Sequence, residues 1–142
     1  MIMPDINVLV YAMREESERY EEYRQWLERH LDGGTPLAVS ELVLSGVLRV
    51  LTHPGIYRPP TPSDLAYAFV SRVREDAALT LRPGPRHWEL FMSLCTSAAA
   101  RGNAVPDAYH AALAIEHNCE WVTTDRDFAR FPGLRWRHPL DG

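Results

Sequence analysis

The sequence predicts an α/β protein, in which a three-layer α/β/α arrangement surrounds a doubly wound, mostly parallel sheet of four to five strands. Short apolar segments alternate with stretches of helical periodicity along the whole chain. Strands separated by helices are joined by parallel crossovers, which place helices on both faces of the sheet. The 142 residues, 46% hydrophobic and 24% charged, are typical of a globular protein, and we expect residues 1–142 to form one domain.

The first half of the chain is expected to contain two strands and three helices. These are a strand at 1–4, a helix at 17–31, a strand at 37–39, and helices at 41–52 and 63–75. Pro4 shortens the first strand. Gly33-Gly34 ends the charged helix at 17–31. Ser40 is a good N-cap for the second helix, and a proline-rich stretch separates that helix from the third.

The second half continues the alternation. The expected elements are a strand at 79–81, a helix from 88 to near Gly102, a helix at 106–118, a strand at 121–123, a helical turn at 127–130 and a strand at 134–137. Trp88, Phe91, Met92 and Cys95 follow helical spacing, and Pro106 suits a first helical turn.

The charges exclude several classes of function. All fifteen basic residues are Arg, so mechanisms that require a catalytic lysine are excluded, including those of haloacid-dehalogenase-like phosphatases and receiver domains. A net charge of −4 makes non-specific DNA binding unpromising. No Gly-rich fingerprint follows the first strand, which excludes a Rossmann dinucleotide site.

Cysteines and apolar runs indicate the compartment. Cys95 and Cys119 are too few for a disulfide scaffold, and no apolar run is long enough to span a membrane. The first charged residue is acidic Asp5, which is not typical of a signal peptide. We therefore expect a cytoplasmic protein with no membrane association.

Acidic residues follow the predicted strands at one edge of the sheet. Asp5, Glu41 and Asp125 come after strands one, two and four, and Asp107 lies in the first turn of the helix that leads into strand four. Ligands of such folds bind beyond the carboxyl ends of the strands. Taken singly, each of the last three acids has a plain alternative role, because acids also stabilise helix N-termini and turns.

Together the four acids indicate a cation. Carboxylates at one edge repel one another, and hard oxygen ligands without nearby Cys or paired His suit Mg²⁺ or Mn²⁺. A water held by such a cation is a ready nucleophile for a phosphodiester. Asn7 is expected either to cap a short helix or to orient that water, and His110 is expected to be a helix position and not a zinc ligand.

Three segments carry a family resemblance. DINVLVYA, SELVLSGVLRVLTHP and PDAYHAALAIEHNCEWVTTDRDFARFPGL resemble the acidic blocks of PIN-domain ribonucleases, and more narrowly those of VapC-type toxins. The resemblance implies a metal-dependent endoribonuclease with Asp5 and Asp107 as metal ligands. It implies Glu41 and Asp125 as the remaining catalytic acids.

The resemblance also implies auxiliary groups and partners. Asn7, Thr124 and Asp127 stand where the family places auxiliary polar side chains. The implied partners are an RNA substrate and a cognate antitoxin, within a homodimer or a toxin–antitoxin hetero-oligomer. Because guanidinium groups bind carboxylates tightly, we expect the antitoxin to place an Arg beside the acids. The alternative is a PIN-fold interaction module that has lost catalysis, against which the retention of all four acids argues.

Overall fold

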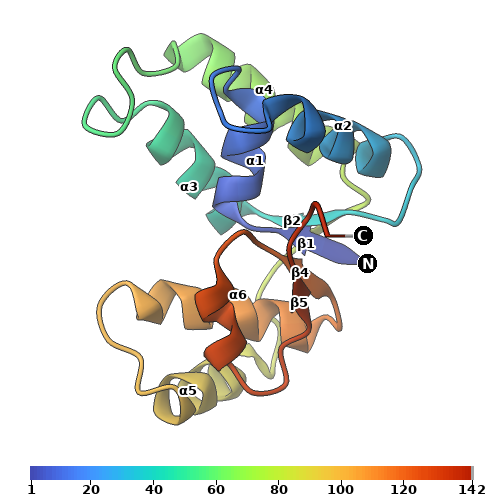
Figure 1. Cartoon of the computed structure of the whole chain (residues 1–142). Helices are drawn as coiled ribbons and strands as arrows, with labels where there is room; N and C mark the ends of the chain where they lie inside the picture. The colour runs from blue at the N-terminus through green and yellow to red at the C-terminus, as the bar shows by residue number, and fades with distance from the viewer. Residues whose placement is uncertain (142) are drawn as a thin grey trace.

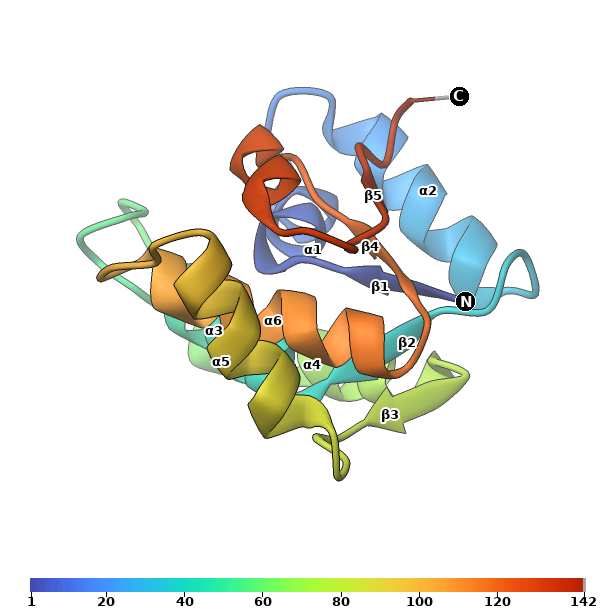
Figure 2. The ribbon, with the colours of Figure 1, turned by 90° about the horizontal axis from the view of Figure 1, so that it is seen from below.

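Helices lie on both sides of a layer of short strands, with α1 to α4 on one side and α5 and α6 on the other (Figure 1). The computed structural model describes residues 1–141. The elements follow one another as β1 (Ile2–Pro4), α1 (Ile6–Met13), α2 (Tyr20–Leu31), β2 (Ala38–Ser40), α3 (Glu41–Leu51), α4 (Ser63–Asp76), β3 (Leu79–Leu81), α5 (His87–Ser97), α6 (Ala104–Glu116), β4 (Glu120–Val122), the 3-10 helix η1 (Arg126–Arg130) and β5 (Trp136–Arg137). Seen from below, α5 and α6 lie in front of the strands (Figure 2). The predicted α/β class is confirmed.

The strands pair in parallel, in the order β3-β2-β1-β4-β5. The ladders β2–β3, β1–β4 and β4–β5 are regular, but β1 is joined to the β2 side only by one isolated parallel bridge, between Ile2 and Leu37, the residue before β2. The Ile2 amide donates to the Pro36 carbonyl across this junction. Two residues on, Pro4 has no amide to donate, so the ladder toward β2 stops there. The sheet is therefore divided into a three-stranded and a two-stranded part.

Helix boundaries follow the predicted caps in most places. The Ser40 hydroxyl accepts from the Val43 amide at 3.1 Å and caps α3, as expected. The start of α2 differs from the prediction, because Arg19 has a left-handed backbone with a φ of 61° and the helix begins only at Tyr20. The carboxylate of Asp5, not Asn7, caps α1, which begins at Ile6.

Part of the core lies beneath the segment that follows β4. Trp121 on β4 and Phe128 on η1 are almost completely buried, and their ring centroids are 5.4 Å apart. Their burial fixes the segment that follows β4 against the body of the protein. Within the described residues, no helix is both long and apolar enough to cross a membrane.

Candidate active site

Asp5 is a buried carboxylate at the carboxyl end of β1. Its side chain is 7% exposed and accepts hydrogen bonds from the Ile6 amide at 2.7 Å and from the Thr123 hydroxyl at 2.7 Å. Burial raises the pKa of Asp5 from 3.8 to about 6, against the lowering effect of these two bonds. Asp107 and Asp125 also raise this pKa, which indicates that their charges reach the Asp5 carboxylate.

Thr123 joins two of the acids. It is fully buried at the end of β4, next to the end of β1 in the parallel ladder. While its hydroxyl donates to Asp5, the same oxygen accepts from the Asp125 amide at 3.0 Å. The hydroxyl therefore fixes the distance between the strand-one and strand-four acids. The sequence analysis missed this residue, although its place directly after an apolar strand was visible in the printed sequence.

Asp107 brings a third carboxylate from α6. It lies in the first turn of that helix, and Arg130 donates to its Oδ2 at 2.9 Å. Burial raises the pKa of Asp107 and Arg130 lowers it, while Asp125 and Asp127 raise it further. The charges of two acids from the start of η1 thus reach Asp107, together with the Arg130 guanidinium.

Asp125 and Asp127 belong to the turn that begins η1. The Asp125 carboxylate accepts from the Asp127 amide at 2.9 Å and caps η1. Asp127 is exposed, and its charge acts on Asp107. The turn-capping role expected as the plain alternative for these acids is therefore present, alongside their electrostatic effect on the cluster.

Glu41 does not join the cluster in the structure. Its side chain is 54% exposed, and its carboxylate accepts from the Arg74 Nε at 3.2 Å and lies 3.8 Å from Nη2 of the Arg82 guanidinium. Arg74 comes from the last turn of α4 and Arg82 directly follows β3. Two arginines from the β3 side of the sheet thus hold Glu41, and its expected place among the catalytic acids stays a prediction.

Among the described residues, two of the predicted auxiliary residues, Asn7 and Thr124, make no side-chain contact with the acids through a hydrogen bond. Asn7 is exposed in the first turn of α1, and Thr124 is half-buried. Over residues 1–141, neither side chain makes a hydrogen bond within the protein. The hydroxyl that contacts the acids belongs to Thr123, one position earlier than predicted.

His110 lies one turn after Asp107 but faces the core. Its ring stacks on Trp121 with centroids 5.5 Å apart, and its Nδ1 is buried without a hydrogen-bond partner. Burial lowers the pKa of His110 to about 4, so the ring is neutral at physiological pH. The prediction of a packed helix position fits this environment.

The cluster has the chemistry of a hard-cation site. Asp5, Asp107 and Asp125 offer only carboxylate oxygens, which suit Mg²⁺ or Mn²⁺, and Mg²⁺ needs only one or two protein carboxylates besides water. In the described part of the chain, no three acid, His or Cys side chains already stand in metal-binding geometry. A cation at Asp107 would also have to compete with Arg130 for the carboxylate. The residues fit a cation once the side chains of Asp107 and Asp125, which now bond to Arg130 and to the Asp127 amide, turn toward it.

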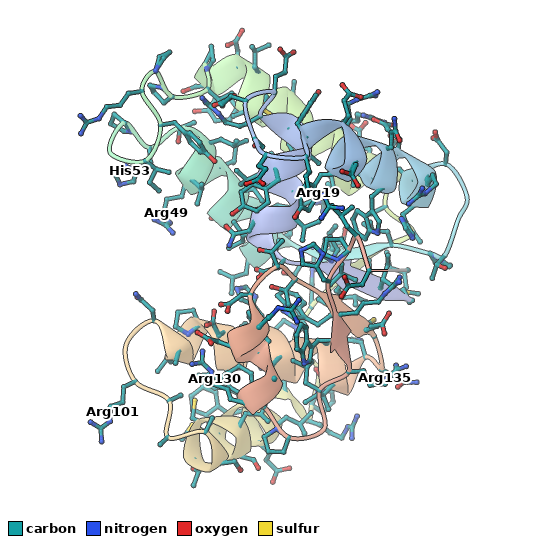
Figure 3. The ribbon with its side chains drawn as sticks, in the orientation of Figure 1. Arg19, Arg49, His53, Arg101, Arg130 and Arg135 are labelled. Atoms are coloured by element: carbon teal, nitrogen blue, oxygen red, sulfur yellow. The ribbon has the colours of Figure 1, made fainter. Side chains whose placement is uncertain are left out.

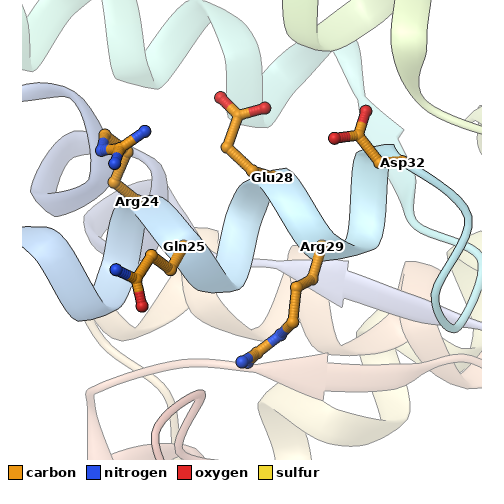
Figure 4. Close-up of a pocket in the computed structure, with 5 residues that line it drawn as sticks. All are labelled: Arg24, Gln25, Glu28, Arg29 and Asp32. Atoms are coloured by element: carbon orange, nitrogen blue, oxygen red, sulfur yellow. The ribbon is translucent and has the colours of Figure 1, made fainter.

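A depression elsewhere on the surface has a different character. Figure 4 shows it along α2, where Arg24, Gln25, Glu28, Arg29 and Asp32 line it. Glu28 is already paired with Arg72 of α4 at 2.6 Å. The depression is lined by residues of both charges, which partly neutralise one another. It lacks buried acids with a raised pKa of the kind found around Asp5.

Comparisons with known proteins agree with this geometry. Residues 2–134 match the family model described as PIN domain. VapC ribonuclease Mb2897 of Mycobacterium bovis is 45% identical over 143 residues, covering 100% of this chain and 97% of that protein.

Solved structures of lower identity share the fold. The structure of VapBC2 from Rickettsia felis bound to a DNA fragment from its promoter gives a TM-score of 0.73 at 20% identity, covering 97% of this chain and 98% of that one. A toxin-antitoxin complex from Klebsiella pneumoniae gives 0.62 at 20% identity, with complete coverage of both chains.

Proposed function

The chain belongs to the PIN-domain family and, within it, to the VapC ribonucleases, and we propose that it is the endoribonuclease toxin of a toxin–antitoxin pair. The observation that supports the proposal is that the Thr123 hydroxyl joins Asp5 to the Asp125 amide, while the charges of Asp107 and Asp125 raise the pKa of Asp5. Members of this family depend on a metal ion. Our proposal assigns that metal to Asp5 and Asp107, with Asp125 completing the cluster.

Each side chain has a distinct task in this proposal. Bound at the cluster, a divalent cation supplies charge stabilisation for the phosphodiester and activation of the attacking water. Asp5 is held in place by the Ile6 amide and the Thr123 hydroxyl, so it meets an incoming cation without reordering its own side chain. Asp107 lies in the first turn of α6 and Asp125 caps the start of η1, and the charges of both raise the pKa of Asp5.

We further propose Mg²⁺ or Mn²⁺ as the ion, a cognate antitoxin as the protein partner and the cytoplasm as the place of action. The ion follows from the all-oxygen donor set. The partner is supported by the family and by the toxin-antitoxin complexes among the structures with the same fold. Auxiliary roles for Asn7, Thr124 and Asp127 remain part of the proposal, and Asp127 has the strongest support because its charge acts on Asp107.

The test is RNA cleavage by the purified chain with Mg²⁺ or Mn²⁺ and with EDTA. We expect metal-dependent cleavage inside the RNA chain, and a loss of at least about 100-fold in Asp107→Asn. Asp64→Asn is the matched control, because Asp64 is also a first-turn acid but lies on α4. Binding of an antitoxin without any metal-dependent cleavage would overturn the proposal in favour of an interaction module.

A further inference from the structure

Arg130 is the one guanidinium bonded to the acid cluster within residues 1–141. It is the last residue of η1, and Figure 3 labels it in the lower half of the molecule, on the segment beside α6. Its Nη2 lies 2.9 Å from Asp107 Oδ2, and the two side chains are 34% and 28% exposed. A water-accessible ion pair of this kind can open and close without disturbing the core.

The backbone beneath Arg130 is held by buried neighbours, while its side chain is partly exposed. Phe128 and Phe131, on either side of Arg130, are buried with ring centroids 5.8 Å apart. Asp125 caps the start of the same 3-10 helix. The Arg130 guanidinium carbon lies 5.0 Å from the Phe131 ring, which offers the group a resting face when it leaves Asp107. Movement is thus confined to the side chain.

A divalent cation and this guanidinium compete for the same carboxylate. Asp107 Oδ2 accepts from Arg130, and Asp107 is one of the two ligands assigned to the metal. Two cations at one carboxylate repel each other, so metal binding favours the open pair. The freed guanidinium then stands at the edge of the site, where it can bind a phosphate of the RNA. Its planar donor fork matches phosphate oxygens.

We propose that Arg130 serves two states of the site: without metal it neutralises Asp107, and with metal it positions the RNA phosphate. The proposal rests on the function proposed above. It makes Arg130 a positioning residue whose removal helps metal binding and harms cleavage. A residue with a purely structural role would not produce these opposite effects.

The test compares Arg130→Gln with Arg126→Gln. Arg126 is an exposed residue of the same 3-10 helix and has no hydrogen bond or ion pair within the described chain, so it controls for the loss of one positive charge. Mn²⁺ is titrated without RNA, by calorimetry or by electron paramagnetic resonance. We expect Arg130→Gln to bind Mn²⁺ about fivefold more tightly, as for removal of one partly exposed ion pair, and Arg126→Gln to change affinity less than about twofold.

Cleavage is then measured at saturating Mn²⁺. We expect kcat/KM of Arg130→Gln to fall by about tenfold or more and that of Arg126→Gln to stay within about threefold. Arg130→Lys keeps the charge but loses the fork, so its Mn²⁺ affinity should match the wild type while its cleavage still falls.

Unchanged or weaker Mn²⁺ affinity in Arg130→Gln, or wild-type cleavage by it, would overturn this proposal while leaving the proposed function standing. Absence of Mn²⁺ binding or of cleavage in the wild type would overturn both.

Discussion

Two neighbouring parts of the carboxyl edge of the sheet, which we call the first and the second edge, carry acids at strand ends in different surroundings. At the ends of β1 and β4, Asp5 is buried and its pKa is raised to about 6 by burial and by nearby acids. At the ends of β2 and β3, Glu41 stands in the solvent between Arg74 and Arg82. The first edge concentrates negative charge, while the second neutralises it.

The difference teaches that the end of a parallel strand is not by itself a functional site. Ion pairs between exposed side chains contribute little, usually below about 1 kcal/mol. A buried carboxylate near like charges is costly to ionise, and such a cost is typical of groups that bind a cation or a substrate. Burial and the nature of the neighbours distinguish the two edges.

The largest expected effect is on catalysis. Asp5→Asn removes the charge from the first edge at constant volume and should reduce RNA cleavage by at least about 100-fold, whereas Glu41→Gln at the second edge should cost less than about tenfold. Single-turnover cleavage of one RNA by both purified variants measures this. Equal losses in the two variants would remove the distinction between the edges.

The pH dependence of stability tests the burial of Asp5, which distinguishes the first edge from the second. In the metal-free protein, the raised pKa of Asp5 means that the folded state binds more protons than the unfolded state between about pH 4 and 6. Its stabilising contribution is therefore present below pH 4 and is lost as the pH rises through 6. The shift corresponds to about 3 kcal/mol as an upper value.

The contribution of His110 to stability changes with pH in the opposite direction, because its pKa is lowered to about 4. Its contribution is present above its ordinary pKa of 6.5 and is lost as the pH falls toward 4. The two effects oppose each other in the wild type. Urea unfolding from pH 4 to 7 should therefore show stability rising with pH in Asp5→Asn and falling with pH in His110→Gln. Parallel profiles in the two variants would contradict the assigned burial.

A smaller effect is expected for the bridging hydroxyl. Thr123→Val leaves a buried Asp5 oxygen and the Asp125 amide without their partner, which should destabilise the protein by about 2 kcal/mol. Thr124→Val is the matched control and should stay within about 0.5 kcal/mol. Chemical denaturation of both variants measures the free energy of unfolding. Comparable losses in the two variants would mean that the Thr123 hydrogen bonds contribute no more to stability than the half-buried hydroxyl of Thr124 does.

The fold was predictable because its signals are local. The cap at Ser40, the short apolar strands and the glycine and proline breaks each act over a few residues, and all of these elements are present. Where the prediction erred, a nearby residue performed the role instead. Asp5 caps α1 in place of Asn7, since its carboxylate already lies at the helix start and accepts from the Ile6 amide.

The site was predictable only in part, because its decisive contacts join distant segments. The acids that follow β1 and β4 could be matched, since parallel pairing aligns the ends of neighbouring strands. The ion pairs of Glu41 span about thirty to forty positions, and that between Arg130 and Asp107 spans 23. No spacing rule along the chain reveals such pairs, so the neutralisation of Glu41 and the guanidinium within the cluster emerge only from the structure.

The central claim is that the edge of β1 and β4, and not that of β2 and β3, holds the metal. Calorimetric titration of Mn²⁺ into RNA-free wild type, Asp5→Asn and Glu41→Gln tests it without relying on catalysis. The account predicts that Asp5→Asn weakens binding by about tenfold or more, as expected for loss of a ligand, while Glu41→Gln binds as the wild type does. Weakened binding in Glu41→Gln with wild-type affinity in Asp5→Asn would contradict it.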